Sequence, residues 1–283
     1  MTEHAHSTVL SVEIDTSVAH EARVYDYWLG GKDNYPADRA LGDVIALHVP
    51  TIRTMARANR AFLGRAVRHL VEEAGITQFL DIGTGIPTAG NTHEVAQRLD
   101  PSARVVYVDN DPIVLAHARA LMSGTESGRT TFIHADLHEP NSILGHPAVS
   151  EVLDFDKPIA IMLVAIMMYF RDDHRPGDIV QTLVDAVPSG SYLAVTHPTA
   201  DFDPAAMAGV AAAAEQSGIP FQPRSRTEVE SLFGGTTLVE PGVVPVLGWR
   251  PEQSVVSATP LRPGHHTVDP TSAWYWAGVG RKD

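Results

Sequence analysis

The chain has 283 residues, and 21 Lys and Arg residues against 34 Asp and Glu residues give it a formal net charge of −13. At roughly 150 residues per domain, this length allows one large domain or two small ones. The 44% of hydrophobic and 19% of charged residues are typical of a globular chain with a sizeable core. The absence of cysteine excludes disulfides, thiolate metal ligands and cysteine nucleophiles. The acidic balance argues against non-specific binding to nucleic acid or to anionic membranes.

No cationic segment followed by an apolar run stands at the start of the chain, so no targeting signal is predicted. The longest apolar stretch, residues 159–170, is shorter than the roughly 20 residues that span a bilayer. We therefore expect a cytoplasmic protein with no membrane partner.

Three helices are predicted near the start of the chain, after a loose tail. Apolar positions recur at helical spacing, a double glycine ends the first helix, and a proline begins the second. The tail covers residues 1–17, the first helix ends at Gly30-Gly31, the second follows Pro36, and the third covers about 51–73. We take residues 1–74 as a tail with a helical cap and residues 75–283 as the main domain.

From Thr77 onward, short apolar runs alternate with helical segments, a pattern typical of a parallel sheet with crossover helices. The predicted strands are 78–82, 104–108, 130–134, 159–164 and 191–196, with a closing strand at 274–279. The predicted fold class is therefore α/β, a Rossmann-like, mostly parallel sheet with helices on both faces and an N-terminal helical cap.

Helix starts in this domain carry capping signals. Two of them pair an N-cap with a glutamate three residues later, and two place a proline directly after an aspartate. The pairs are Asn91 with Glu94, Ser225 with Glu228, Asp111 with Pro112, and Asp203 with Pro204.

Residues 241–270 hold six prolines and are predicted to form an ordered loop or insertion rather than a helix. Such an insertion can serve as an interface between two copies of the chain, so a homodimer is an expectation.

The most informative motif is FLDIGTGIPT, residues 79–88, in which a strand ends at Asp81 and a glycine turn leads into a helix. Glycines at this turn let the backbone approach a nucleotide-like cofactor closely. A dinucleotide fingerprint would need a third glycine where Thr88 stands, and no Gly-Lys-Ser/Thr follows for a phosphate loop. The remaining pattern is Asp-x-Gly-x-Gly, the first motif of class I S-adenosylmethionine (SAM) methyltransferases. SAM carries an ammonium and a sulfonium, which suit an acidic site.

Two further strands end in acids that can complete such a site. Asp109 stands at the end of VVYVD, where a carboxylate can accept hydrogen bonds from both ribose hydroxyls. Asn110 follows it and is placed to touch the adenine. Asp136 and Leu137 follow the third strand, where the fold can bind the adenine amino group.

Candidate catalytic residues follow the fourth and fifth strands. Residues 163–168, including Val164, are expected to line the floor near the transferred methyl, and Tyr169 follows them. His197 in AVTHPTAD can act as a general base if the acceptor is a hydroxyl, although a structural histidine fits equally well. His134 and His138 are four residues apart but straddle a strand end, so no metal site is predicted.

The segment RVYDYWLGGKDNYPAD, residues 23–38, groups aromatic and polar side chains around a double glycine. It is either a lid over a ligand or an ordinary helix–turn–helix, and the pattern alone favours the second. The lid would use Tyr25, Tyr27, Lys32 and Asn34.

These segments together resemble one family, the actinomycete-type SAM-dependent methyltransferases long catalogued as a domain of unknown function. The resemblance covers about residues 23–281 and is carried by RVYDYWLGGKDNY, FLDIGTGIPT, VVYVDNDPIVLAHARAL and SYLAVTHPTAD. It favours the lid interpretation and implies SAM as cofactor. The cofactor residues it implies are Asp81, Gly83, Thr84, Gly85, Pro87, Thr88, Asp109, Asn110 and Asp136.

Two positions depart from related patterns. General class I enzymes often have a third glycine where this chain has Pro87, although Pro fits this family. Family members often carry Leu-His where this chain reads Met167-Met168, which puts activity or substrate in question.

The predicted function is SAM-dependent methyl transfer to a small-molecule acceptor, with secondary metabolism as the expected setting. Two alternatives remain open from the sequence. One is a SAM- or nucleotide-binding protein without transferase activity. The other is an NAD(P)-dependent oxidoreductase, which is disfavoured because this sequence has Thr88 in place of the third glycine and no obvious Tyr-x-x-x-Lys relay.

Overall fold

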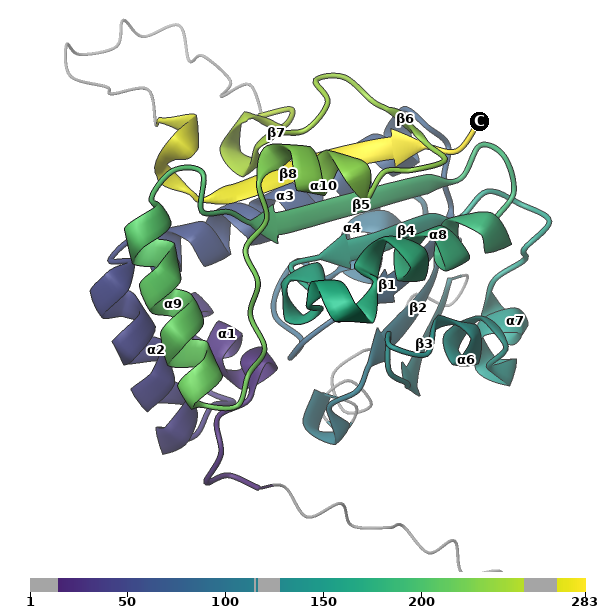
Figure 1. Cartoon of the computed structure of the whole chain (residues 1–283). Coiled ribbons are helices and arrows are strands. Elements are labelled where there is room, and N and C mark those ends of the chain that lie inside the picture. The colour runs from purple at the N-terminus through teal and green to yellow at the C-terminus, as the bar shows by residue number, and fades with distance from the viewer. Residues whose placement is uncertain (1–14, 115, 117–127, 252–268) are drawn as a thin grey trace, which may run out of the picture.

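The computed structural model describes residues 15–114, 116, 128–251 and 269–283. Eight strands within these ranges form one sheet with the order β3-β2-β1-β4-β5-β8-β6, and β7 pairs with β8 outside this path (Figure 1). The strands are β1 Gln78–Ile82, β2 Arg104–Asp109, β3 Arg129–His134, β4 Ala160–Val164, β5 Tyr192–Pro198, β6 Thr237–Leu238, β7 Val244–Pro245 and β8 Tyr275–Arg281.

The five strands from β3 to β5 are parallel to one another, and β8 runs antiparallel beside β5. The short strands β6 and β7 pair antiparallel with β8. This confirms the predicted fold class and the predicted strands to within two residues at each end.

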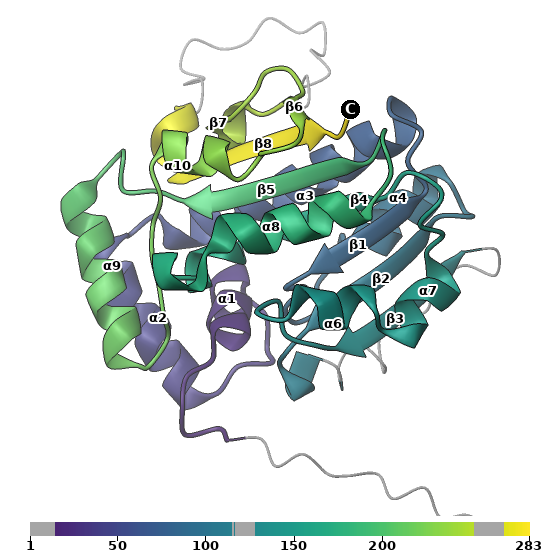
Figure 2. The same cartoon turned by 45° about the vertical axis from the view of Figure 1, so that its right-hand side comes forward.

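Helices cover both faces of the sheet and its carboxyl edge (Figures 1 and 2). Helices α3 and α4 lie behind the sheet in Figure 2, and α6, α7, α8 and α10 lie in front. Helices α1, α2 and α9 gather beyond the carboxyl end of β5. The bounds are α1 Glu21–Leu29, α2 Pro36–His48, α3 Ile52–Glu72, α4 Thr92–Leu99, α6 Pro140–Leu144, α7 Pro147–Val152, α8 Pro176–Ala186, α9 Pro204–Gln216 and α10 Arg226–Ser231, with short 3-10 turns η1 Met167–Tyr169, η2 Asp172–His174, η3 Val246–Gly248 and η4 Pro270–Ser272.

The central strands are buried on both faces, as a parallel sheet between two helix layers requires. All five residues of β1 are buried. Phe79 packs in the core that includes α3, whereas its neighbour Leu80 packs in the core that includes α8. The alternation of side chains along a strand therefore supplies two separate hydrophobic cores.

Two of the four predicted helix caps form as expected and one does not. Ser225 and Glu228 make a capping box at α10, and Asp203 accepts a hydrogen bond from the Ala206 amide at α9. At α4, Asn91 is the N-cap as predicted, but the capping box with Glu94 does not form. The Glu94 carboxylate reaches past the N-cap to accept from the Gly90 amide at 2.7 Å, and the Asn91 side chain accepts from the Thr88 amide at 3.2 Å.

At the fourth site, Asp111 accepts a hydrogen bond from the Ile113 amide at 2.8 Å, as a capping aspartate does. Most of the helix predicted after Pro112 lies outside the described residues.

The start of the proline-rich segment closes over α3. The Trp249 side chain is fully buried and meets Phe62 edge to face, with ring centroids 5.2 Å apart. Arg65 of α3 donates to the Trp249 carbonyl at 2.8 Å and to the Val246 carbonyl at 2.6 Å. Of residues 241–270, where an interface between copies was expected, residues 252–268 lie outside the described ranges. Among the residues that the structure describes, no helix is long and apolar enough to cross a membrane.

Candidate functional site

A cavity of about 480 Å³ lies at the carboxyl ends of β1, β2, β3 and β4, within the size range of small-molecule and cofactor sites. Eleven of the residues singled out from the sequence line it. They are Tyr25, Asp81, Gly83, Thr84, Gly85, Asp109, Asn110, Asp136, Leu137, Val164 and Tyr169. The structure thus brings the ends of four strands and one cap helix to a single site.

The glycine loop after β1 needs its glycines for two different reasons. Gly83 has φ of +75°, and a Cβ there would stand 2.6 Å from the Ile166 side chain. Gly85 has φ of +65° with open space around the missing Cβ, so its side lies open toward the cavity. The Gly83 amide donates to the Val108 carbonyl at 2.8 Å, which ties the loop to the end of β2.

Asp81 and Asp109 are buried carboxylates, 6% and 8% exposed, in the wall of this cavity. Asp81 accepts a hydrogen bond from the Thr92 hydroxyl at 2.6 Å. Asp109 accepts from the Gly85 amide at 2.8 Å and from the Asp111 amide at 2.9 Å. Within the described ranges, neither carboxylate has a cationic group close enough to form an ion pair.

Burial raises the pKa of Asp81 to about 6, although the hydrogen bond from Thr92 lowers it. Burial likewise raises the pKa of Asp109 to about 6, although the amides of Asp111 and Gly85 lower it. The charges of Arg60 near Asp81 and of His20 near Asp109 lower these pKa values, but burial outweighs them. A cationic ligand in the cavity would add a further positive charge.

Asp136 lines the same cavity just after β3, the strand that pairs with β2. Its carboxylate accepts from the His138 amide at 2.9 Å and lies 2.8 Å from the Nδ1 atom of the same residue. Burial alone would raise the pKa of Asp136, but these hydrogen bonds outweigh it and hold the pKa below the usual value. The His138 ring packs on Phe170, with centroids 4.3 Å apart, so two loops meet at this wall.

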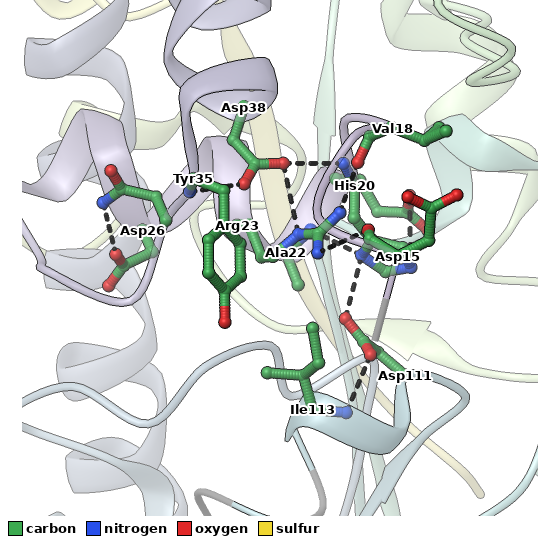
Figure 3. Close-up of polar contacts among 12 residues, drawn as sticks. Asp15, Val18, His20, Ala22, Arg23, Asp26, Tyr35, Asp38, Asp111 and Ile113 are labelled. Carbon is green, nitrogen blue, oxygen red and sulfur yellow. Dashed lines mark hydrogen bonds and ion pairs between the residues drawn. The ribbon is translucent and has the colours of Figure 1, made fainter. Parts of the chain in front are cut away.

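Residues 18–22, which directly follow the predicted tail, also line the cavity. A buried ion pair holds them there, because the Arg23 Nε atom lies 3.1 Å from an Asp38 carboxylate oxygen (Figure 3). Arg23 also donates to the carbonyls of Asp15 and Val18, and Asp38 accepts from the His20 amide. The His20 ring then lies 3.1 Å from the Asp111 carboxylate, across from the end of β2.

Of the four residues of the 23–38 segment that are predicted to face the cofactor, only Tyr25 lines the cavity. Helical residues two apart point about 200° apart, so Tyr25 and Tyr27 cannot face the same side. Tyr27 donates its hydroxyl to Asp43 at 2.7 Å on the exposed side of the helix. Neither Lys32 nor Asn34 lines the cavity, and Asn34 instead donates to the Asp26 carboxylate at 2.8 Å.

The double glycine belongs to this turn rather than to a ligand site. The Asp26 carboxylate accepts from the Asp33 amide at 3.0 Å. A Cβ on Gly31 would stand 1.8 Å from the same carboxylate, so only glycine fits there. This turn accounts for the pattern of Asp26, Gly31, Asp33 and Asn34 within the segment.

Pro87 and Thr88, also predicted to touch the cofactor, do not line the cavity. The Thr88 amide turns back to donate to the Asn91 side chain, which draws this part of the loop toward α4.

His197 does not line the cavity, so the expectation that it reaches the cofactor edge is wrong. The side chain is fully buried, and its Nδ1 lies 2.8 Å from the Pro198 carbonyl. Arg224 donates to Nε2 at 3.1 Å, so the ring is the neutral tautomer with its proton on Nδ1. Burial lowers the pKa of His197 to about 4, which is the behaviour of a structural histidine.

Tyr169 does lie in the cavity wall, at the end of η1. Burial raises the pKa of its hydroxyl well above the usual value, and the Glu21 carboxylate acts in the same sense. Of the two methionines before it, Met167 packs in the core on the α8 face, whereas Met168 lines a second, smaller cavity.

Several lining residues carry no sequence signal for a ligand. Asn59 and Arg60 lie on the third helix, and a loop after α9 supplies residues 217–220. Asn59 links the cap to the sheet, since it donates to the Tyr25 hydroxyl at 2.9 Å and accepts from Thr196 at 2.6 Å. A helical position such as this reveals its role only once the packing of the helix is known.

Taken together, the mostly parallel sheet, the glycine loop after β1 and the acid at the end of β2 define the fold and cofactor edge of a class I SAM methyltransferase. A family model described as S-adenosyl methyltransferase matches residues 7–283. The chain belongs to this family, which makes it a methyltransferase with SAM as its cofactor. The NAD(P) alternative is thereby set aside.

Two solved structures are similar along nearly the whole chain. One is a DUF574 family protein from Streptomyces avermitilis, with 43% identity, a TM-score of 0.89 and coverage of 96% of this chain and 100% of that one. The other is a candidate methyltransferase from Thermobifida fusca, with 43% identity, a TM-score of 0.83 and coverage of 95% and 97%. No curated protein matches the chain by sequence.

Proposed function

We propose that this methyltransferase acts on a small-molecule acceptor and holds SAM in the 480 Å³ cavity. The observation that carries the proposal is the pair of buried carboxylates, Asp81 and Asp109, that face the cavity without an ion-pair partner among the described residues. A ligand with an ammonium and a sulfonium fits this donor set, whereas the phosphates of a dinucleotide would be repelled by it.

Each wall of the cavity has a proposed task. Asp109, at the end of β2, accepts hydrogen bonds from the ribose hydroxyls, and Asp136 with Leu137 borders the adenine. Asp81 and the glycine loop lie nearest the amino-acid portion of the ligand. SAM supplies an electrophilic methyl group on its sulfonium, and the chain positions an acceptor beside it and excludes water.

Calorimetric titration with SAM, S-adenosylhomocysteine and NAD tests this proposal. We expect both adenosyl compounds to bind and NAD to give no heat. Asp109→Asn should weaken binding of both compounds strongly, because a carboxylate that accepts hydrogen bonds from two hydroxyls is replaced by an amide with one acceptor oxygen. The matched control is Asp156→Asn, which changes an exposed acid in a turn away from the site.

Normal SAM affinity in Asp109→Asn would contradict the assignment of Asp109, and a preference for NAD would contradict the whole proposal. Binding of SAM without transfer from methyl-labelled SAM to any acceptor would instead favour a binding protein without transferase activity.

A further inference from the structure

A second, smaller cavity of about 50 Å³ adjoins the cofactor cavity beneath the cap helices. The two cavities share four lining residues, Glu21, Tyr25, Tyr169 and Ile219. Beyond them, side chains of α2, α3 and α9 make an apolar wall. Its members include Leu41, Ile45, Met55, Met207, Val210 and Ala214.

Two tyrosine hydroxyls in this region have no hydrogen-bond partner among the described residues. Tyr275 is only 4% exposed and lines the second cavity, yet its hydroxyl contacts no protein donor or acceptor. The Tyr169 hydroxyl, at the junction of the cavities, likewise has no hydrogen-bond partner among the described residues. Tyr25 differs, because it donates to the Ala56 carbonyl and accepts from Asn59. Neither hydroxyl is among the fully buried unpartnered polar atoms of the described residues, so each faces cavity space where a ligand can hydrogen-bond to it.

We propose that the second cavity is the acceptor subsite and that it takes a neutral, mainly apolar ring compound whose reacting group is a hydroxyl. This inference rests on the proposed function, since it requires SAM in the larger cavity. The acceptor ring lies among the side chains of α2, α3 and α9, and its hydroxyl lies at the junction beside Glu21 and Tyr169.

The lining explains why the acceptor is neutral. Among the side chains that line the second cavity, Glu21 is the single charged one, and it stands at the junction rather than at the apolar end. A charged acceptor buried among Leu41, Ile45 and Val210 would lose its hydration without a partner.

The size of the cavity is adjustable. An apolar cavity of about 150 Å³ holds benzene, so a ring can enter this one only if its walls move. Three methionines, Met55, Met168 and Met207, line it, and their unbranched side chains repack readily. We expect these three side chains to shift when an acceptor binds.

Glu21 explains why the reacting group is a hydroxyl. A carboxylate beside an amine stabilises the ammonium form, which has no lone pair to attack a methyl group. The same carboxylate can instead take the proton of a hydroxyl. In that step the acceptor oxygen forms a bond to the methyl carbon, its O–H proton passes to Glu21, and the carbon–sulfur bond breaks with its electron pair left on sulfur. The side chain of Glu21 is 28% exposed, so the proton can leave to solvent.

The binding part is tested on the full chain with S-adenosylhomocysteine bound and its methionines labelled with ¹³C in the methyl group. Phenol is the probe, and we expect it to shift the signals of Met55, Met168 and Met207. Met162 serves as an internal reference, because it is fully buried in β4 and lines neither cavity. Benzoate, which has the same ring with a charge, should leave all four signals in place.

A filled cavity should abolish this response. Val210→Phe places a ring in the wall on α9, and the matched control Val44→Phe places one on α2 at a position 43% exposed. We expect both variants to bind S-adenosylhomocysteine and the phenol shifts to vanish only in Val210→Phe. If Val210→Phe fails to bind S-adenosylhomocysteine, the milder Ala214→Leu replaces it.

The chemical part is tested with methyl-labelled SAM and excess phenol or benzylamine, an alkyl amine basic enough to be held as ammonium beside a carboxylate. We expect labelled anisole from phenol, no product from benzylamine, and a loss of about 100-fold in transfer for Glu21→Gln with the methionine shifts retained. The control is Glu139→Gln, an exposed glutamate outside both cavities.

The outcomes separate the two proposals. If S-adenosylhomocysteine binds but phenol moves no methionine signal, the acceptor subsite is wrong and the proposed function stands. Transfer to benzylamine alone, or no labelled anisole, overturns the assignment of a hydroxyl acceptor. If S-adenosylhomocysteine itself does not bind, the proposed function fails as well.

Discussion

At the scale of single residues, the two buried acids of the large cavity differ from ordinary surface carboxylates in what they do to the free energy of folding. The pKa values of Asp81 and Asp109 are raised by burial to about 6, above the usual value near 4. The folded chain therefore binds protons more tightly than the unfolded chain does, and folding stability falls as the pH rises from about 4 through 6. A cationic ligand binds the ionised form of these acids and so offsets the free energy that their ionisation costs.

This linkage predicts how SAM affinity depends on pH. Because the ligand favours the ionised carboxylates, its affinity should rise as the pH increases from about 5 to about 7.5, and binding near pH 6 should release protons. Calorimetry in buffers with different ionisation enthalpies measures the released protons. The double variant Asp81→Asn/Asp109→Asn is the control, titrated with enough SAM to saturate its weakened site, and should release none. An affinity in the wild-type chain that does not change across this range would contradict the prediction.

For His197, the predicted dependence of folding stability on pH has the opposite sign. Burial lowers its pKa to about 4, so the unfolded chain takes up a proton below pH 6.5 that the folded chain refuses, and stability is lost as the pH falls from 6.5 to 4. His197→Ala should cost about 1–3 kcal/mol at pH 7.5, because Arg224 loses an acceptor. The gap in unfolding free energy between wild type and variant, measured in urea, should narrow toward pH 4. SAM affinity should not change, and a large loss of affinity would return His197 to the site.

At the scale of elements, Arg224 explains why η1 stands where it does. Its guanidinium donates to the carbonyls of Met167 and Phe170 and to the carboxylate of Asp172. These contacts fix the turn after β4, which carries Tyr169 into the cavity wall. His197 contacts the same guanidinium through its Nε2 atom but does not line the cavity.

The turn between α1 and α2 offers a matched pair of glycine substitutions. Gly31→Ala should destabilise the chain by about 1–3 kcal/mol, since its Cβ would overlap the Asp26 carboxylate that organises the turn. Gly64→Ala lies inside α3 with open space around it and should stabilise by about 0.5–1 kcal/mol. Urea denaturation of both variants measures the difference. Equal stabilities would mean that the Asp26 turn contributes little.

The sequence predicts the strands more accurately than it predicts which faces of the helices line the cavity. Strands and their carboxyl ends follow from apolar runs, so the pattern of the chain is enough to place Asp81 and Asp109 at one edge of the sheet. The choice between Tyr25 and Tyr27 depends on how α1 is rotated against its neighbours, which no local pattern records. His20 and Glu21 reach the cavity through the Arg23–Asp38 ion pair. That pair joins two helices, and neither residue alone indicates it.

At the scale of the whole molecule, the helices before β1 share their core with the sheet. Phe62 and Leu70 of α3 pack in the same cluster as Phe79 of β1 and Ala194 of β5. Helix α9 closes on α2 so tightly that a Cβ on Gly209 would stand 2.3 Å from the His48 ring. The division of the chain at residues 74 and 75 stays a prediction about sequence organisation, and this packing leads us to expect that both parts unfold together.

Scanning calorimetry of the full chain tests this expectation. A shared core predicts one transition whose calorimetric and van't Hoff enthalpies agree. S-adenosylhomocysteine at 100 times its Kd should stabilise the folded chain by about 2.7 kcal/mol and move the whole transition upward, because its cavity is walled by α1 and α3 as well as by the sheet. Asp109→Asn should leave the transition single and reduce the ligand-induced rise. Two transitions, of which the ligand moves only one, would instead mean that the helical cap folds apart from the sheet.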